Sequence, residues 1–206
     1  RMAQGAVQCV AAPEQLPEGL CEECAVSLTG TVCAEPRASG GFEVHLEGLE
    51  LLSRPAEPMP VPVSKRKLDL NLDTELSLRP LVLRELRRRA VFRVQEGVCR
   101  AFRDYLHGQG FTEIHTPKIV HAGAEGGSNI FRLDYFGRKA FLAQSPQFYK
   151  QMMVGVYERV FETAPVFRAE KHNTVRHLNE YTSLDFEMGF IESFYDVIEM
   201  ETGFLK

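Results

Sequence analysis

Apolar and polar positions alternate with a period of two along the first quarter of the chain. In the stretch "FEVHLEGLELLS" the apolar residues Phe42, Val44 and Leu46 are separated by polar ones. Other short apolar runs in residues 1–52 are bounded by turn residues. A period of two is typical of a strand with one buried face. We therefore predict a small all-β module over residues 1–52.

Residues 53–80 break this pattern. Several prolines and the basic run "SKRK" interrupt the apolar positions, and "LDLNLDTELSLRP" follows. Proline stiffens the backbone, so this composition is typical of an extended linker or hinge packed along a surface. We predict that the segment joins two domains.

A helical period begins near Arg84. Apolar residues then recur at steps of three and four, which predicts a helix with one buried face, and "HGQG" supplies glycines that end it. The residues of this face are Val91, Val94, Val98, Ala101, Phe102 and Tyr105. The stretch "FTEIHTPKIV" follows as a predicted strand. Pro117 cannot donate a ladder hydrogen bond, so we expect it at an edge, an end or an interface.

The next segments alternate between strands and a helix. After the glycine-rich loop "HAGAEGGSN", the stretches "IFRLDYF" and "KAFLAQ" are predicted to pair as a hairpin across Gly137 and Arg138. Ser145 and Pro146 in "SPQFYKQ" are typical of a helix start, as N-cap and first helical residue. Residues three apart project together from a helix, so Gln147 and Lys150 share one face.

Two further strands are predicted at 159–170, interrupted by Pro165, and at 179–190. They include the stretch "FRAEKHNTVRHLNEYTSLDFEMGF". Because side chains alternate between the faces of a strand, each strand has an apolar side and a charged side. The charged sides carry Arg168 and Glu170 on one strand and Tyr181, Ser183, Asp185 and Glu187 on the other.

Two interpretations of this charged stretch stay open on alternation alone. If the strands pair as an antiparallel hairpin, their charged sides form one platform under a basic loop at residues 171–178. Such a platform offers what a nucleotide needs, namely a guanidinium for phosphate, a ring for a base and acids for an ammonium group or a metal. A solvent-facing sheet with Arg and Glu pairs is the commoner outcome of the same pattern.

Composition and charge narrow the class of protein. The 206 residues suffice for one large or two small domains, and 44% are apolar. A net charge of −4 argues against general polyanion binding but leaves room for a local basic patch. No apolar run has the length of a bilayer span and no secretory signal is recognisable, so we expect a soluble, cytoplasmic protein.

The ends and the cysteines raise two more expectations. The chain starts without Met and stops in the helical pattern "DVIEMETGFLK", so we expect a fragment or the ordered part of a longer protein. Five cysteines include the pair Cys21 and Cys24, with Cys9 and Cys33 nearby, which raises the possibility of zinc. The outer two stand alone inside predicted strands, so reduced thiols are the favoured interpretation.

Four stretches of the second part resemble the class II aminoacyl-tRNA synthetases, and among them the aspartyl-tRNA synthetases of the archaeal type. "FTEIHTPKI" is similar to the first motif of that family, whose helix, strand and proline form a dimer interface. "FRAEKHNTVRHLNEYTSLDFEMGF" is similar to the second motif almost end to end. "AEGGSNIF" and "AFLAQSPQFYKQMM" resemble the substrate-closing loop and the amino-acid-binding segment. The resemblance covers about residues 75–206.

The resemblance implies an α+β fold and a ligase activity. Residues 1–52 would be part of an OB-type anticodon-binding β-barrel, 53–80 a hinge, and 81–206 the N-terminal part of the family's antiparallel-sheet catalytic domain. The implied reaction activates L-aspartate with ATP and Mg²⁺ to aspartyl-adenylate and transfers it to tRNA(Asp), while charging of tRNA(Asn) stays open. The implied assembly is a homodimer. The family's third motif and its later metal-binding acids are not in these residues, so the segment holds no metal ligands and is expected to be inactive alone.

The resemblance also implies an ATP site on the second motif. Arg168 would hold the α-phosphate and stabilise charge during transfer. Glu170 would contact the adenosine side, and Tyr181 would stack on adenine. Arg176 and His177 would reach the outer phosphates or the tRNA acceptor end.

The same resemblance implies an aspartate site and a dimer contact. Gln147, Lys150 and Asp185 would bind aspartate, with Lys150 at its side-chain carboxylate and Asp185 at its ammonium group. Glu125 would lie on the loop that closes over the amino acid. Pro117 would lie at the dimer interface.

Three alternatives remain. An asparaginyl-tRNA synthetase would use the same platform, although Lys150 would then face a neutral amide. A non-catalytic, RNA-binding synthetase paralogue would keep the fold without the reaction. A nucleic-acid binder with an OB module and no ATP site is the third.

Overall fold

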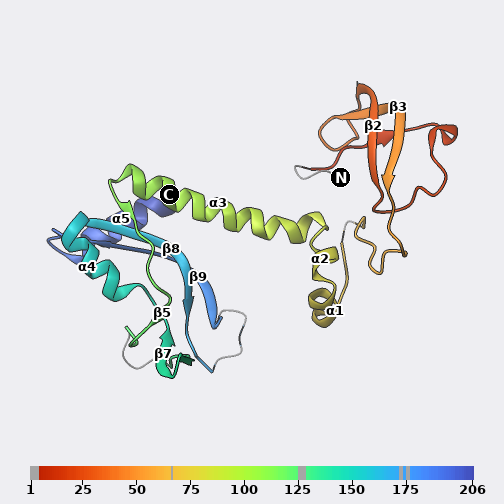
Figure 1. Cartoon of the computed structure of the whole chain (residues 1–206). Helices are drawn as coiled ribbons and strands as arrows, with labels where there is room; N and C mark the ends of the chain where they lie inside the picture. Colours follow the sequence, from red (N-terminus) through yellow and green to blue (C-terminus); the bar gives the residue numbers. More distant parts are fainter. Residues whose placement is uncertain (1–4, 66, 125–128, 172–173, 175–176) are drawn as a thin grey trace. The chain divides into compact units, whose positions relative to one another are not determined.

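The computed structural model describes residues 5–65, 67–124, 129–171, 174 and 177–206. It divides into two compact units, Arg1–Arg89 and Ala90–Lys206, and the division falls within one helix, α3 (Leu86–Gly108). Both units combine strands with helices (Figure 1). The predicted α+β fold class is therefore confirmed.

The first unit begins with a three-stranded sheet. Strands β1 (Cys9–Val10), β2 (Ala25–Ala34) and β3 (Phe42–Ser53) lie in the order β1-β3-β2, with β2 antiparallel and β1 parallel to β3. A short 3-10 helix, Pro13–Gln15, follows β1. The register of β2 shifts at Gly30, where an added Cβ would lie 2.1 Å from the His45 carbonyl oxygen. Only glycine fits this irregularity, which increases the twist of the strand pair.

The proline-rich segment of the first unit ends in two short helices, α1 (Leu72–Ser77) and α2 (Arg79–Val82). Asn71 caps α1 by accepting a hydrogen bond from the Thr74 backbone N–H at 2.8 Å. A small core of buried side chains joins the extended chain to these helices, namely Val61, Val63, Leu68 and Val82. Residues 61–82 thus pack as a folded segment in addition to connecting the chain.

The main sheet of the second unit has the order β4-β8-β9. Strand β8 (Arg159–Phe167) pairs antiparallel with β9 (Glu180–Met188) over their full length, and β4 (Thr112–Glu113) runs parallel to the start of β8. The two predicted strands therefore pair as the antiparallel hairpin that the sequence left open. The prediction that Pro165 interrupts β8 is wrong, because β8 pairs with β9 on both sides of this residue. The other strand described beside β8 is β4, which pairs with Val160 and Phe161 alone, so the missing N–H of Pro165 breaks no hydrogen bond to β4.

Helices cover both faces of the β8 and β9 pair (Figure 1). The C-terminal half of α3 and helix α5 (Phe194–Leu205) pack on its apolar face. This core consists of Phe102, Leu106, Phe111 and Phe161, with Leu184, Phe186, Met188, Met200 and Phe204 around them. Helix α4 (Gln147–Tyr157) contacts the opposite face. The alternation predicted for β9 is therefore confirmed, since Leu184, Phe186 and Met188 all turn to the core.

A second small sheet of this unit has the order β5-β7-β6. The predicted hairpin is formed by β6 (Arg132–Tyr135) and β7 (Arg138–Leu142), with Phe136 and Gly137 at positive φ in the turn. Strand β5 (Ile119–Val120) pairs with the end of β7. The prediction of one continuous strand over 111–120 is wrong. The chain leaves β4 after Glu113 and enters β5 at Ile119, so that Pro117 lies between two different sheets.

Two helices keep exposed apolar residues within this chain. The stripe predicted to be buried on α3 is buried at Phe102 and half-buried at Tyr105, but Val91 and Val94 are each 65% exposed. On α4 the side chains of Phe148, Met152 and Val156 are exposed as well. None of the helices described combines the length and the apolar character needed to cross a membrane.

Candidate active site

A cluster of paired charges lies on the polar face of β8 and β9. In the register of the two strands, Glu162 is opposite Asp185 and Val160 is opposite Glu187. Lys150 of α4 reaches this face and places its Nζ 2.6 Å from Asp185 Oδ1 and 3.0 Å from Glu187 Oε2. One lysine is therefore shared between two carboxylates on alternate positions of β9.

The environment of Lys150 keeps its ammonium group charged. Burial lowers the pKa of Lys150, but the hydrogen bonds to Asp185 and Glu187 outweigh that effect, so the pKa lies above the ordinary lysine value. The side chain of Lys150 is 13% exposed. A buried ammonium without these carboxylates would be costly, which explains why α4 packs with this residue facing β9.

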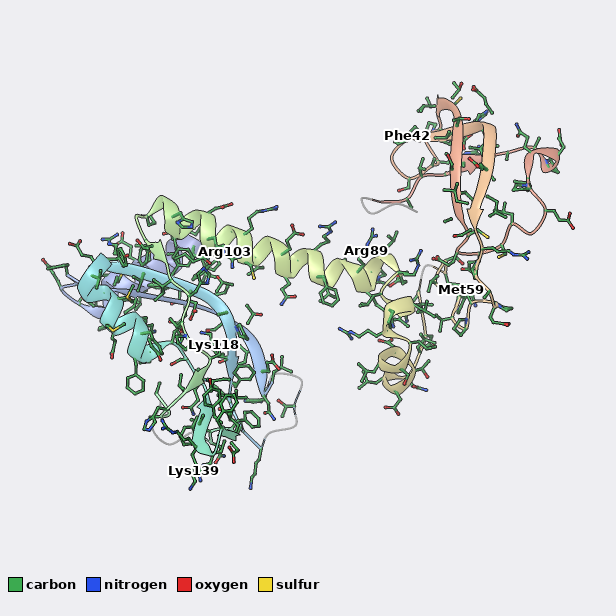
Figure 2. All side chains as sticks on the ribbon, in the orientation of Figure 1. Phe42, Met59, Arg89, Arg103, Lys118 and Lys139 are labelled. Atoms are coloured by element: carbon green, nitrogen blue, oxygen red, sulfur yellow. The ribbon has the colours of Figure 1, made fainter. Side chains whose placement is uncertain are left out.

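A second charged cluster lies beside the first and involves Glu162, whose side chain is 3% exposed. Its carboxylate accepts hydrogen bonds from the Thr116 backbone N–H at 2.6 Å and the Thr116 hydroxyl at 2.9 Å. Lys118, which is labelled in Figure 2, places its Nζ 2.7 Å from Glu162 Oε2. Glu162 therefore holds both residues that flank Pro117 and fixes the path of the chain between β4 and β5.

Arg168 and Glu170 lie just beyond the end of β8, and both are half-buried. The Arg168 backbone N–H donates to the Asn179 carbonyl oxygen at 2.9 Å. With its amide oriented to suit its neighbours, Asn179 donates from its side chain to the carbonyl oxygens of Glu170 at 3.0 Å and Arg168 at 3.2 Å. The Ala169 backbone N–H donates to the Asn129 carbonyl oxygen at 3.0 Å. Residues 168–170 thus continue the hairpin and join it to the end of the glycine-rich loop.

The remaining described residues of the predicted ATP and aspartate sites lie on these same elements. Tyr181 is half-buried on β9, opposite Val166. Gln147 is the first residue of α4 and is half-buried, one turn before Lys150. The predicted helix start is displaced by one residue, because Pro146 is the N-cap and the Ser145 hydroxyl accepts from the Gln147 N–H at 3.3 Å.

Several predicted residues lie elsewhere. Glu125 and Arg176 are outside the described residues, so their predicted roles stay predictions. His177 is exposed, and its Nδ1 lies 2.6 Å from the Thr174 hydroxyl oxygen. Pro117 is exposed and lines a hollow of about 340 Å³ with Tyr149, Met152 and Tyr157.

Sequence reasoning missed Glu162, Lys118 and Asn179 as members of the charged region. Strand alternation gives a signal for Glu162, because it has the same parity as Arg168 within the predicted strand 159–170. No local pattern indicates that Lys118 and Thr116 bind Glu162, since the pairs are 44 and 46 residues apart. Asn179 resembles an ordinary turn residue until its contacts with Arg168 and Glu170 are known.

The charge pattern of this region suits a ligand with both an ammonium group and acidic groups. Lys118 and Lys150 face Glu162, Asp185 and Glu187, which leaves one carboxylate in excess. The ammonium group of a ligand can bind Asp185 or Glu187, and a carboxylate of the ligand can then replace that residue as a partner of Lys150. The region therefore offers an opposite charge to the ammonium group and to one carboxylate of such a ligand.

The described residues fit a nucleotide better than a metal. A half-buried guanidinium at Arg168 and an aromatic ring at Tyr181 are the groups that phosphate and a base need. Among the residues that the structure describes, no group of three or more His, Cys, Asp or Glu side chains is placed to hold a metal ion. None of the described residues is therefore assigned to Mg²⁺.

Two curated relatives and one solved structure are similar to the whole or most of the chain. An aspartate-tRNA(Asp/Asn) ligase of Deinococcus radiodurans is 52% identical over 205 residues, which cover 100% of this chain and 46% of the relative. An aspartate-tRNA(Asp) ligase of Pyrococcus horikoshii is 49% identical over 177 residues, covering 85% of this chain and 40% of the relative. The chain therefore spans about half the length of the curated relatives it matches.

The crystal structure of asparaginyl-tRNA synthetase from Pyrococcus horikoshii complexed with asparaginyl-adenylate has the same fold. Its TM-score is 0.87 at 32% sequence identity, over 100% of this chain and 48% of that one. The family model of class II tRNA synthetases (D, K and N) matches residues 71–206, a range that includes every element around the charged region. Together with the paired-strand platform, α4 and its lysine, this match confirms the resemblance that the motifs predicted: the chain belongs to the class II tRNA synthetases (D, K and N).

Proposed function

We propose that the protein is an aspartate-tRNA ligase that activates L-aspartate with ATP and transfers it to tRNA. The observation that carries this proposal is the position of Lys150, an ammonium group 13% exposed and held between Asp185 and Glu187. The side-chain carboxylate of a substrate can replace Asp185 or Glu187 at Lys150, because it accepts the same kind of charge-assisted hydrogen bond. Relatives named as aspartate ligases support the same substrate.

In the proposed complex the amino acid exchanges partners with the resident ion pairs. Its ammonium group binds Asp185, its side-chain carboxylate binds Lys150, and Gln147 hydrogen-bonds from one turn earlier on α4. Glu187 and Glu162 stay in place below as counter-charges for the lysines. The α-carboxylate of the substrate is then left to react.

The proposed first step needs no nucleophile from the protein. The α-carboxylate of aspartate attacks the α-phosphorus of ATP, the bond to the bridging oxygen breaks, and pyrophosphate leaves with the electron pair. Arg168 binds the α-phosphate and stabilises the charge that develops there, while Glu170 and Tyr181 hold the adenosine. Positioning and electrostatics supply the catalysis.

In the proposed second step a hydroxyl at the 3′ end of tRNA attacks the mixed anhydride, and AMP leaves. Arg176 and His177 fall between β8 and β9 in the sequence, and we assign them to the outer phosphates or to the tRNA acceptor end. We assign Glu125, which is outside the described residues, to the closing of the site over the amino acid, as the family resemblance implies. This activity belongs to protein synthesis, so we expect the enzyme in the cytoplasm.

We propose a homodimer with Pro117 at its interface. The hollow beside Pro117 and the exposed apolar residues of α4 support an interface on this side of the unit. Exposed Val91, Val94 and Val98 on α3 offer a second apolar stripe for the partner. The double variant Val94→Glu, Val98→Glu should sediment as a monomer, and a dimer at micromolar concentration would contradict this arrangement.

The same platform would serve asparagine in an asparaginyl-tRNA synthetase, and the similarity to such an enzyme bound to its adenylate favours keeping this alternative. Lys150 argues against it, because a neutral amide leaves the ammonium group without a charged partner from the substrate. A non-catalytic paralogue would bind RNA without forming an adenylate.

Exchange of labelled pyrophosphate into ATP tests the three possibilities in the complete protein. We expect exchange that depends on aspartate and that asparagine does not support. Exchange with asparagine alone would identify the asparaginyl enzyme, and no exchange with either would favour the non-catalytic paralogue. Aspartylation of tRNA(Asp) and tRNA(Asn) transcripts then decides which tRNAs are substrates.

A further inference from the structure

Two thiols of the first unit are held in contact by a tight turn. The Sγ atoms of Cys21 and Cys24 are 3.5 Å apart. The Cys24 backbone N–H donates to the Cys21 carbonyl oxygen at 3.3 Å and closes the turn. The Cys21 backbone N–H donates to the Cys24 sulfur at 3.3 Å. We call residues 21–24 the clamp turn, because Glu22 and Glu23 bind Ser64 and Arg84.

The two residues between the cysteines bind distant parts of the same unit. The Glu22 carboxylate accepts a hydrogen bond from the Ser64 backbone N–H at 3.0 Å, and the Glu23 carboxylate pairs with Arg84. Glu23 has a φ of 66°, a region that non-glycine residues adopt seldom and at some cost. The clamp turn therefore ties the β module to residues 64–84, in a backbone conformation that its contacts must maintain.

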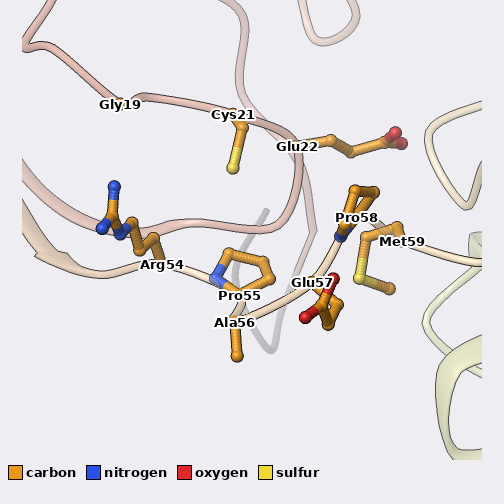
Figure 3. Close-up of a pocket in the computed structure, with 9 residues that line it drawn as sticks. All are labelled: Gly19, Cys21, Glu22, Arg54, Pro55, Ala56, Glu57, Pro58 and Met59. Atoms are coloured by element: carbon orange, nitrogen blue, oxygen red, sulfur yellow. The ribbon is translucent and has the colours of Figure 1, made fainter.

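The Cys21 thiol opens into a hollow of about 690 Å³ (Figure 3). In that view its sulfur points toward the opposite wall, where Arg54 and Pro55 lie. The hydrogen bond with Cys24 raises the pKa of the Cys21 thiol, and the positive charge of Arg54 acts in the other direction. A small molecule fits a hollow of this size. Glu22 and Glu57 also line the hollow, and the Arg54 guanidinium is the group in its lining that can bind a carboxylate of that molecule.

The geometry points to a redox-active dithiol: we propose that Cys21 and Cys24 are oxidised reversibly to a disulfide by a low-molecular-weight disulfide that carries carboxylates. A four-residue turn keeps the two Cα atoms within the separation that a disulfide spans. Among the described residues no third His, Cys, Asp or Glu completes a metal cluster here. This inference does not depend on the proposed function.

The oxidation of the two thiols proceeds by two thiol–disulfide exchange steps. One thiolate attacks a sulfur of the disulfide R–S–S–R and releases one thiolate RS⁻, which leaves a mixed disulfide on the protein. The second cysteine thiolate attacks the protein sulfur of that mixed disulfide and releases the second RS⁻. The protein loses two protons and two electrons, and R–S–S–R is reduced to two RSH.

The disulfide should hold the clamp turn closed. Because the sulfurs already touch, bond formation requires a small movement, and Glu22 and Glu23 keep their contacts with Ser64 and Arg84. The covalent link removes open conformations of residues 21–24 that would release those contacts. Oxidation should therefore slow the opening of the junction between the β module and the segment that follows it.

The first test treats the reduced protein with oxidised glutathione and measures peptide masses. We expect a product lighter by two hydrogen atoms, with Cys9, Cys33 and Cys99 still open to alkylation, and the same product in the double variant Cys9→Ser, Cys33→Ser. In Cys24→Ser a mixed disulfide should accumulate on Cys21. A stable mixed disulfide in the unaltered protein, or loss of the product in the double variant, would refute the pairing.

The second test concerns Arg54. The variant Arg54→Ala should react severalfold more slowly with oxidised glutathione, while its rate with the uncharged 2-hydroxyethyl disulfide should stay within about twofold of the unaltered protein, since a charge-assisted contact is lost with the first reagent alone. Equal slowing with both reagents would remove Arg54 from the proposal. Matching circular dichroism spectra would show that the variant is folded.

The third test measures amide hydrogen exchange at Ser64. Exchange should be slower in the oxidised protein than in the reduced protein, and this difference should vanish in Cys24→Ser treated in the same way. Faster exchange after oxidation would mean that the disulfide breaks the clamp, and an unchanged rate would mean that the turn does not control the junction.

Discussion

Two antiparallel strand pairs of this protein carry charged side chains at alternate positions, yet the charges differ in what they do. On β3 the Glu47 carboxylate, which accepts a hydrogen bond from the Thr31 hydroxyl of β2 at 2.6 Å, belongs to an exposed residue. On β8 and β9 the carboxylates of Glu162 and Asp185 are 3% and 18% exposed and bind lysines from other elements.

The difference lies in what covers each polar face. Nothing among the described residues covers Glu47 on β3, whose side chain is exposed. Helix α4 and the chain around Pro117 cover the polar face of β8 and β9, and each brings a lysine. A charge on a covered face must be paired, because an unpaired buried charge is costly. A ligand with charged groups can bind there by replacing the resident partners. The same alternation thus gives an exposed carboxylate on β3 and, on β8 and β9, a covered set of paired charges that we propose as the binding site.

Removing one guanidinium from each region should give the largest difference between the two strand pairs. The substitution Arg168→Ala should lower the rate of aspartate-dependent pyrophosphate exchange by about a thousandfold, because the charge developing on the α-phosphate loses its donor. Arg37→Ala should leave the rate unchanged, since Arg37 is 90% exposed beside the β2 and β3 pair. Near-normal exchange in Arg168→Ala would refute its phosphate role.

Loss of the shared lysine should have the next largest effect. Lys150→Met should raise the KM for aspartate by about a hundredfold, because a buried carboxylate of the substrate loses its counter-charge, while the KM for ATP should change little. Lys139→Met on the exposed β6 and β7 hairpin serves as control. An equal rise in both KM values would indicate general damage to the site, and an unchanged aspartate dependence would contradict the assignment of Lys150.

Glu162 tests the part of the comparison that concerns stability. Glu162→Gln should destabilise the fold by about 2 kcal/mol, because Lys118 loses its buried partner and the two donors of Thr116 share a weaker acceptor. Glu47→Gln removes a carboxylate on β3 that is exposed, so its effect should stay within about 0.5 kcal/mol. Urea unfolding of both variants measures the two values. Equal losses would mean that burial does not separate the regions.

The pH dependence of stability gives the smallest expected effect. The pKa of Lys150 is raised in the folded protein, so its contribution to stability is fully present below the unfolded lysine pKa of about 10.4 and is lost as pH rises through the folded value. The difference in unfolding free energy between the unaltered protein and Lys150→Met should therefore be constant from neutral pH to about pH 10 and shrink above it. Shrinkage near pH 8 would mean that the paired carboxylates do not hold the proton on Lys150.

Much of the second unit could be predicted from the sequence because its signals are local. Alternation predicted the two strands and the polar face with Asp185 and Glu187, while their pairing as a hairpin was left open. Helical spacing placed Gln147 and Lys150 one turn apart on α4. The single strand over 111–120 was a wrong prediction, because nothing local indicates that the chain passes from one sheet to another at Pro117.

The sequence by itself determined which residues of β9 share a face, where the long helices and the paired strands of the second unit form, and the family to which the chain belongs. These properties follow from backbone geometry and from motifs within a few residues of each other. Only the tertiary structure decided that Lys150 binds Asp185 and Glu187, that Glu162 holds Thr116 and Lys118, and that Cys21 and Cys24 touch beneath a clamp to Ser64 and Arg84. These contacts depend on which distant segments pack together and on how far that packing excludes water. The local pattern of apolar and polar residues contains neither piece of information.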